Sequence, residues 1–170
     1  MFMNIMFMVI IVRFKYMFMN IMFMVIIKRD AELKNVEKLG KWVYICGRRK
    51  TGKTFFVKNF TKWDEYYFVR KDNYVFGKEG NAIEYKTFFE IVKRELGKKR
   101  IVIDEFHRLP EEFFEYLHMV GRKGSLIAVS STLGFSLKLL GGRSPLMGVF
   151  KGFVFPLASP VDVVNSLKRQ

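Results

Sequence analysis

The sequence predicts an α/β protein built around a mostly parallel sheet, and three observations lead to this prediction. From Lys28 onward, short apolar runs alternate with runs of helical periodicity, as in proteins whose parallel strands are joined by helices. Residues 42–46 are an apolar run that leads into a glycine-bearing loop at 47–54. Residues 101–105 are an apolar run that ends in two carboxylates. Parallel sheets bind ligands at the carboxyl ends of their strands, so both runs indicate a site at that edge.

The first half of the domain reads as helix, strand, helix, strand. Residues 30–39 place apolar side chains at helical spacing and end before Gly40, a favourable helix terminator. The uninterrupted apolar run 42–46 is typical of a strand buried on both faces. The predicted helix 53–62 points its amino end, the positive end of its dipole, at the glycine-bearing loop. Aromatic and β-branched residues at 66–70 predict the second strand.

The second half continues the alternation. Segments rich in glycine or charge predict loops at 72–81, 98–100 and 141–145. Apolar residues at helical spacing predict helices over 85–96, 110–120 and 135–140. Pro110 suits the first turn of its helix and Gly121 suits the end. Apolar, β-branched and aromatic runs predict strands at 101–105, 125–129 and 149–157.

Composition bounds the class of protein. The chain has 170 residues, half of them hydrophobic, which suits one domain with a real core and excludes a disordered chain. Its net charge of +14 favours polyanions, anionic membrane surfaces or ATP, without choosing among them. Cys46 is the single cysteine, so no intrachain disulfide can form, and we expect a cytoplasmic protein. His107 and His118 stand apart from other metal-ligating residues, and we expect ordinary surface or packing roles for both.

The amino-terminal segment is a separate feature. Residues 1–11 recur letter for letter at 17–27, which a repeat maintained for packing would not require. This identity indicates a duplication in the coding DNA or a misassigned start. We therefore divide the chain into an extension, 1–27, and a domain, 28–170.

A membrane-associating role for the extension stays open but is not favoured. Each apolar run is shorter than the roughly 20 residues that a spanning helix needs. Spanning with the whole stretch would place Arg13 and Lys15 in the bilayer, at about 2.5–3.5 kcal/mol each. A secretory signal fits poorly, because these basic residues lie inside the apolar region and not before it.

Residues 47–54 read GRRKTGKT and fit G-x-x-x-x-G-K-[ST], the Walker A pattern of nucleoside triphosphatases. The glycines let backbone N–H groups turn inward around a triphosphate. Lys53 can reach the β- and γ-phosphates, and the Thr54 hydroxyl can ligate Mg²⁺. The predicted nucleotide-binding residues are Gly47, Arg48, Arg49, Lys50, Thr51, Gly52, Lys53 and Thr54.

The carboxylates that end the run 101–105 fit the magnesium side of such a site, the Walker B pattern. Asp104, at the carboxyl end of a buried strand, can hold the metal beside the Thr54 hydroxyl. Glu105 can orient the attacking water as a general base.

Hydroxyl residues follow the fourth predicted strand. Ser131 or Thr132 can hydrogen-bond the γ-phosphate or the attacking water, because parallel sheets present ligand contacts at that edge. The other interpretation is a cap on a helix that starts near Leu133, and both can hold together. We take Ser131 as the candidate catalytic residue.

These motifs resemble the archaeal ATPase family, a branch of phosphate-loop ATPases related to AAA+ and STAND proteins. The resemblance covers about 28–164 and rests on GRRKTGKT, IVIDEF, the SST strand end and SPLMG followed by an apolar strand and Pro-Leu. It includes Arg29-Asp30-x-Glu32-Leu33, similar to the family's amino-terminal motif. The first two motifs are general to phosphate-loop ATPases. Their order and spacing relative to SPLMG point to the archaeal ATPase family among them.

The resemblance implies a three-layer α/β/α sandwich with a five-stranded sheet in the order 5-1-4-3-2. It implies ATP as the nucleotide, held by Lys53 and Thr54, with Asp104 on Mg²⁺ and Glu105 on the water. Ser131 or Thr132 would be the sensor on the fourth strand. Residues 29–33 would lie near the adenine.

Two departures from the family concern turnover. Position 149 is valine where the family usually has a basic residue, and the sequence stops before the helical lid, so we expect a core truncated after the nucleotide site. An arginine supplied in trans by a partner or an oligomer would then matter for hydrolysis, and Arg143 is the only candidate within the chain.

Three functional hypotheses follow. The first is a Mg²⁺-dependent ATPase, and the second is a module that binds ATP or ADP without efficient hydrolysis. The third is a DNA-associated ATPase, motivated by the basic residues between Lys28 and Lys62.

Overall fold

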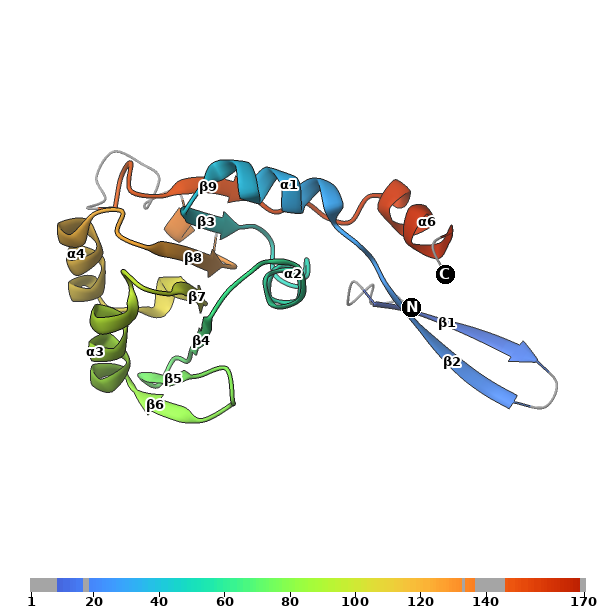
Figure 1. Ribbon diagram of the computed structural model, residues 1–170. Coiled ribbons are helices and arrows are strands. Elements are labelled where there is room, and N and C mark those ends of the chain that lie inside the picture. The colour runs from blue at the N-terminus through green and yellow to red at the C-terminus, as the bar shows by residue number, and fades with distance from the viewer. Residues whose placement is uncertain (1–8, 17–18, 133, 137–145, 169–170) are drawn as a thin grey trace.

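The computed structural model describes residues 9–16, 19–132, 134–136 and 146–168, with side chains from Ile26 onward (Figure 1). The strands are β1 (Val9–Tyr16), β2 (Met19–Ile26), β3 (Trp42–Cys46), β4 (Glu65–Val69), β5 (Tyr74–Phe76), β6 (Ala82–Glu84), β7 (Arg100–Asp104), β8 (Ser125–Ser130) and β9 (Lys151–Val154). The helices are α1 (Asp30–Leu39), α2 (Lys53–Phe60), α3 (Tyr85–Glu95), the 3₁₀ helix η1 (Phe106–Arg108), α4 (Glu111–Val120) and α6 (Pro160–Lys168).

The main sheet has seven strands in the order β6-β5-β4-β7-β8-β3-β9. The five strands from β4 to β9 in this order are parallel, and they stand in the predicted order 5-1-4-3-2. The two additional strands, β5 and β6, are antiparallel and extend the sheet beyond β4. The α/β class and the mostly parallel sheet are therefore confirmed, while the sheet is wider than the five strands expected.

The loop predicted over 72–81 is wrong in part, because it contains β5. Val75 of this strand is fully buried and pairs with Val69 of β4. Asn73 turns the chain with a positive φ of 61°, a conformation that asparagine tolerates better than most residues. The sequence does not indicate this strand, because it is short and flanked by glycine and charged residues. It forms because it pairs with the neighbouring strand β4.

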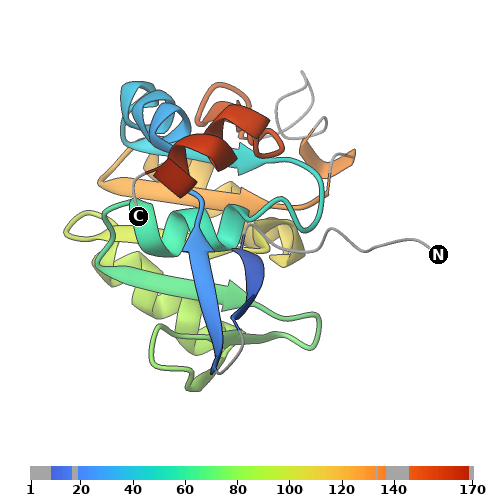
Figure 2. The same ribbon diagram turned by 90° about the vertical axis from the view of Figure 1, so that its right-hand side faces the viewer.

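Helices cover both faces of the sheet and make three layers (Figure 1). Alternate residues of β3 point to opposite faces, so Tyr44 packs on the side of α3 and α4, with Phe88 and Phe113. Ile45 packs on the other side, where Phe56 of α2 is buried. Figure 2 looks onto this second side and shows α1, α2 and α6 in front of the sheet. The predicted sandwich is thus present, with its core on both faces of the parallel strands.

Most element boundaries agree with the predictions to within a few residues, and besides the added strands β5 and β6, two described helices were not predicted. The 3₁₀ helix η1 follows β7 directly, and α6 follows β9. The predicted helix 135–140 and loop 141–145 fall mostly outside the described residues, as does Arg143.

The described part of the extension forms a hairpin. β1 and β2 pair antiparallel, with Val9 opposite Ile26, in a two-stranded sheet separate from the main one. Ile27 is buried, and the Lys28 N–H donates a 3.1 Å hydrogen bond to Ser166 Oγ of α6. Among the described helices, none has the length and apolar character needed to cross a membrane.

Candidate functional site

The glycine-bearing loop leaves β3 at the carboxyl edge of the sheet. Gly47 has a φ of 149°, and a Cβ there would lie 2.7 Å from the backbone oxygen of Phe155. The Phe155 N–H also donates a 2.7 Å hydrogen bond to the Cys46 carbonyl. The chain after β9 therefore packs against the start of the loop, and glycine is needed there for space as well as for backbone conformation.

Lys53, the first residue of α2, turns its side chain into the loop. Its amine donates hydrogen bonds to the carbonyls of Gly47 at 3.0 Å and Arg48 at 2.6 Å. Burial lowers the pKa of this amine, and the neighbouring carboxylates of Asp104 and Glu105 oppose that shift. The Thr51 hydroxyl lies 3.4 Å from the same amine, and a buried cation hydrogen-bonded to neutral oxygens has a strong electrostatic preference for an anion, such as a phosphate group.

Thr54 and Asp104 meet at the carboxyl end of β7. Thr54 Oγ1 donates a 2.6 Å hydrogen bond to Asp104 Oδ2, and the Tyr66 hydroxyl donates one of 2.9 Å to the same oxygen. The other carboxylate oxygen, Oδ1, accepts the Glu105 N–H at 2.8 Å. Burial and then the charge of Asp104 raise the pKa of the Tyr66 phenol, so the hydroxyl stays a donor.

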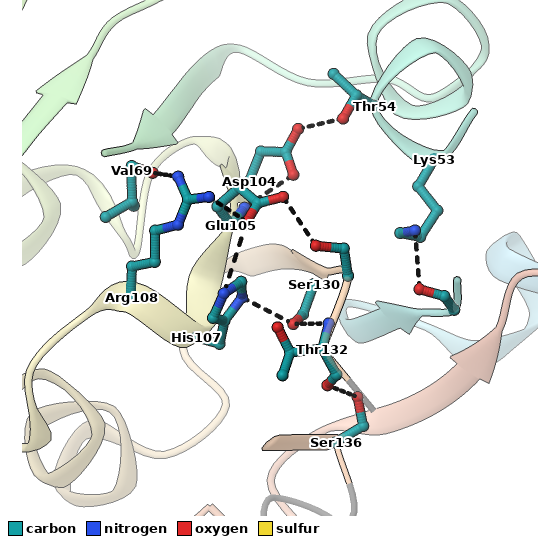
Figure 3. A network of polar contacts seen from close by, with 12 residues as sticks. Lys53, Thr54, Val69, Asp104, Glu105, His107, Arg108, Ser130, Thr132 and Ser136 are labelled. Atoms are coloured by element: carbon teal, nitrogen blue, oxygen red, sulfur yellow. Dashed lines mark hydrogen bonds and ion pairs between the residues drawn. The ribbon is translucent and has the colours of Figure 1, made fainter. Parts of the chain in front are cut away.

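Glu105 has a left-handed backbone, with φ 56° and ψ 38°, which is uncommon for a residue with a side chain. Its Oε1 accepts the Ser131 hydroxyl at 3.1 Å, and its Oε2 lies 2.9 Å from Arg108 Nη2. His107 Nε2 lies 3.6 Å from the same Oε2 (Figure 3). The carboxylate is therefore held between the end of β8 and η1.

The hydroxyl residues after β8 divide between the two roles considered in the sequence. Ser131 contacts Glu105, whereas the carbonyl of Thr132 accepts both the N–H of Ser136, at 3.2 Å, and its hydroxyl, at 2.9 Å. Ser130 is fully buried and its hydroxyl lies 3.0 Å from His107 Nδ1. The structure thus brings Ser131 to the candidate site. It gives Thr132 the backbone contacts of a helix start with Ser136 (Figure 3).

A cavity of about 680 Å³ lies between the glycine-bearing loop and the two carboxylates. Most predicted site residues are part of its wall, namely Arg49, Lys50, Gly52, Lys53, Thr54, Asp104, Glu105 and Ser131. Gly47, Arg48 and Thr51 are not, and they shape the loop: the buried Thr51 hydroxyl donates to the Arg48 carbonyl at 3.0 Å. The wall therefore combines cations for phosphate with the oxygen ligands and carboxylate that a metal and a water would need.

Several residues of the site were missed by sequence reasoning. Tyr66, Lys58, Lys71 and Arg108 surround the two carboxylates or line the cavity, and they come from β4, α2, the turn after β4 and η1. The expectation of an ordinary packing role for His107 is incomplete, because this half-buried ring touches Ser130 and approaches Glu105. Only Arg108 had a local signal, its spacing of three residues from Glu105 within a turn.

The amino-terminal motif is placed beside the loop and not in the cavity wall. Arg29 is almost fully buried, forms a 2.7 Å ion pair with Glu32 and donates a 2.9 Å hydrogen bond to the Pro156 carbonyl. Its guanidinium lies 4.6 Å from the centre of the Phe155 ring. Arg29 thus joins the start of α1 to the segment that packs on Gly47.

Comparison with known proteins places this site in a family. No curated protein matches the chain. The sequence model of the AAA domain matches residues 40–151, a range that runs from just before β3 to the start of β9 and contains the loop, both carboxylates and the end of β8. Family membership agrees with the parallel sheet and with a glycine-bearing loop at its carboxyl edge. The chain therefore belongs to the AAA domain family, a class of P-loop, ATPase-like nucleotide-binding domains.

Proposed function

We propose that this protein is a Mg²⁺-dependent ATPase of the archaeal ATPase branch of phosphate-loop proteins. The observation that carries the proposal is the 2.6 Å hydrogen bond between Thr54 Oγ1 and Asp104 Oδ2. It brings a loop hydroxyl and a strand-end carboxylate to one point on the cavity that Lys53 and Glu105 also line. Each is the group that magnesium-assisted phosphoryl transfer requires at that position.

The donor set fits Mg²⁺. The ion prefers oxygen ligands and is usually held by one or two protein oxygens, with substrate phosphates and water completing its shell. Thr54 and Asp104 supply a hydroxyl and a carboxylate oxygen, and the described residues include no cluster of three His, Cys, Asp or Glu side chains that would form an all-protein metal site. When bound, the metal would neutralise charge on the β- and γ-phosphates.

The residues of the cavity divide the work as follows. The Lys53 amine exchanges its hydrogen bonds to the Gly47 and Arg48 carbonyls for charge-assisted hydrogen bonds to phosphate oxygens. These stronger bonds offset the free-energy cost of burying its charge. Tyr66 and the Glu105 N–H hold the Asp104 carboxylate in a fixed orientation. Glu105 accepts a proton from the attacking water, while Ser131 orients the carboxylate from the opposite side.

A test uses the full chain and two pairs of variants. Wild-type protein should bind ATP more tightly with Mg²⁺ than with a chelator and should release phosphate above background. Lys53→Ala should abolish binding, whereas Lys34→Ala, an exposed lysine of α1, should not. Glu105→Gln should keep binding and lose turnover by about 10²- to 10⁴-fold, the usual contribution of a general base. Glu111→Gln, an exposed glutamate of α4, is its matched control.

The outcomes separate the hypotheses. Binding without turnover in wild-type protein would favour a nucleotide-binding module. Normal ATP affinity in Lys53→Ala would contradict the site itself. Two further proposals are that a partner supplies an arginine and that DNA binds the basic residues between Lys28 and Lys62. Adding the partner or DNA to the same turnover assay would test them.

A further inference from the structure

Arg108 connects the candidate general base to a neighbouring strand. The left-handed turn at Glu105 starts η1, and in a 3₁₀ helix residues three apart lie on the same side. Arg108 Nη2 consequently lies 2.9 Å from Glu105 Oε2, while its Nη1 donates a 2.8 Å hydrogen bond to the Val69 carbonyl at the end of β4 (Figure 3). The rigid fork of a guanidinium suits such a bridge, with an ion pair to the carboxylate on one side and a hydrogen bond to the carbonyl on the other.

The two oxygens of Glu105 are held by different elements. Oε2 faces Arg108, and Oε1 accepts the hydroxyl of Ser131. Both neighbours line the cavity together with Glu105, so the carboxylate has one orientation relative to the space for phosphate.

Without this bridge, other cations would compete for the carboxylate. The described wall of the cavity also contains Arg49, Lys50, Lys53, Lys58 and Lys71. The charge of Glu105 already acts on Lys53, whose pKa it raises against the larger effect of burial. A released Glu105 would pair with such a cation at close range, occupy space intended for phosphate and turn away from the water.

We propose that Arg108 is a positioning residue that holds Glu105 away from the phosphate-binding cations and toward Ser131. This inference rests on the proposed function where it concerns ATP turnover. Where it concerns the affinity for nucleotide, it requires only that the cavity binds nucleotide. The hydrogen bond from Arg108 of η1 to the Val69 carbonyl of β4 then contributes to catalysis as well as to folding.

The experiment measures binding of the non-hydrolysable analogue adenosine 5′-(β,γ-imido)triphosphate with Mg²⁺, and separately ATP turnover. Arg108→Ala should weaken analogue binding by roughly threefold or more, the range of coupling between groups in contact. Glu105→Gln alone should bind as well as wild type, and Arg108→Ala combined with Glu105→Gln should restore the affinity. A merely structural loss would not be restored by the second substitution. Turnover of Arg108→Ala should fall about tenfold or more.

Two further variants complete the test. Arg70→Ala is the matched control, because Arg70 follows β4 directly and forms an exposed 2.7 Å ion pair with Asp72. It should leave both readouts unchanged. Arg108→Lys should recover only part of the turnover, since one ammonium group cannot reproduce the fork between Val69 and Glu105.

The inference is overturned if Arg108→Ala binds and turns over as wild type does, if its turnover rises, or if Glu105→Gln fails to restore its affinity. These results differ from failure of the proposed function, in which wild-type protein itself would neither bind the analogue nor hydrolyse ATP.

Discussion

Thr54 and Asp104 stand fifty positions apart in the chain and share a hydrogen bond of 2.6 Å. Thr54 lies in the first turn of α2 and Asp104 ends β7, so the contact exists only because the loop after β3 and the neighbouring strands end at the same edge of the sheet. The same Asp104 oxygen also accepts the Tyr66 hydroxyl.

Thr54→Ala should uncouple nucleotide binding from magnesium. The substitution removes one of the two oxygens proposed for the metal and leaves Lys53 in place, so affinity for ATP in chelator should change little. Affinity with Mg²⁺ should fall at least about tenfold, as for lost metal-site contacts. Titration of ATP with and without Mg²⁺ measures both. Thr87→Ala, an exposed threonine of α3, is the control, and equal behaviour of the two variants would contradict the assignment.

Tyr66→Phe should destabilise the fold through Asp104. The phenol donates a 2.9 Å hydrogen bond to the buried carboxylate, and a hydrogen bond to a charged group contributes about 1.5–3 kcal/mol. Urea unfolding should show a loss of this size in the free energy of unfolding. Tyr67 is also buried, but it lies on the opposite face of β4, where its ring packs with Phe88. Tyr67→Phe should therefore lower the free energy of unfolding less, because it removes no hydrogen bond to the Asp104 carboxylate. Equal losses would mean that the Asp104 contact contributes nothing.

Gly47→Ala should distort the loop. The added Cβ would lie 2.7 Å from the Phe155 carbonyl oxygen, where only backbone movement can relieve the clash. Together with the strained backbone, we expect a loss of about 1–3 kcal/mol in the free energy of unfolding and weaker ATP binding. Gly97→Ala is the control, since a Cβ there meets no atom within 4 Å. A normal melting temperature for Gly47→Ala would refute the close approach.

His107 should make stability depend on pH. Burial lowers the pKa of its ring from the ordinary 6.5, with Arg108 and Arg49 acting in the same direction and Glu105 and Asp104 opposing them. The unfolded chain therefore binds more protons near this range, and the free energy of unfolding falls as pH drops below about 6.5.

The measurement compares wild type with His107→Asn between pH 8 and pH 5. The wild-type protein should lose more stability on acidification than the variant, because asparagine does not titrate. His118→Asn, an exposed histidine at the end of α4, should track wild type. Parallel pH profiles for wild type and His107→Asn would exclude this effect.

The sequence alone was sufficient to predict the parallel strands and the position of the glycine-bearing loop. Apolar runs such as 42–46, glycine spacing in 47–54 and helical periodicity in 30–39 are short-range patterns, and the chain adopts α1, β3 and the loop within the expected bounds. Asp104 and Glu105 could be recognised in the same way, because carboxylates directly after a buried strand mark its exposed end.

The partners of those carboxylates could not be predicted from the sequence. Tyr66 reaches Asp104 through the register that pairs β4 with β7, and Ser131 reaches Glu105 because β8 lies on the other side of β7. Strand register depends on packing over the whole sheet, so no local pattern states which residues will meet. The sequence thus determined that a glycine-bearing loop and a pair of carboxylates follow buried strands. Their arrangement around one cavity, with Glu105 held by Arg108, depends on how the strands align and on a left-handed turn that local preferences disfavour.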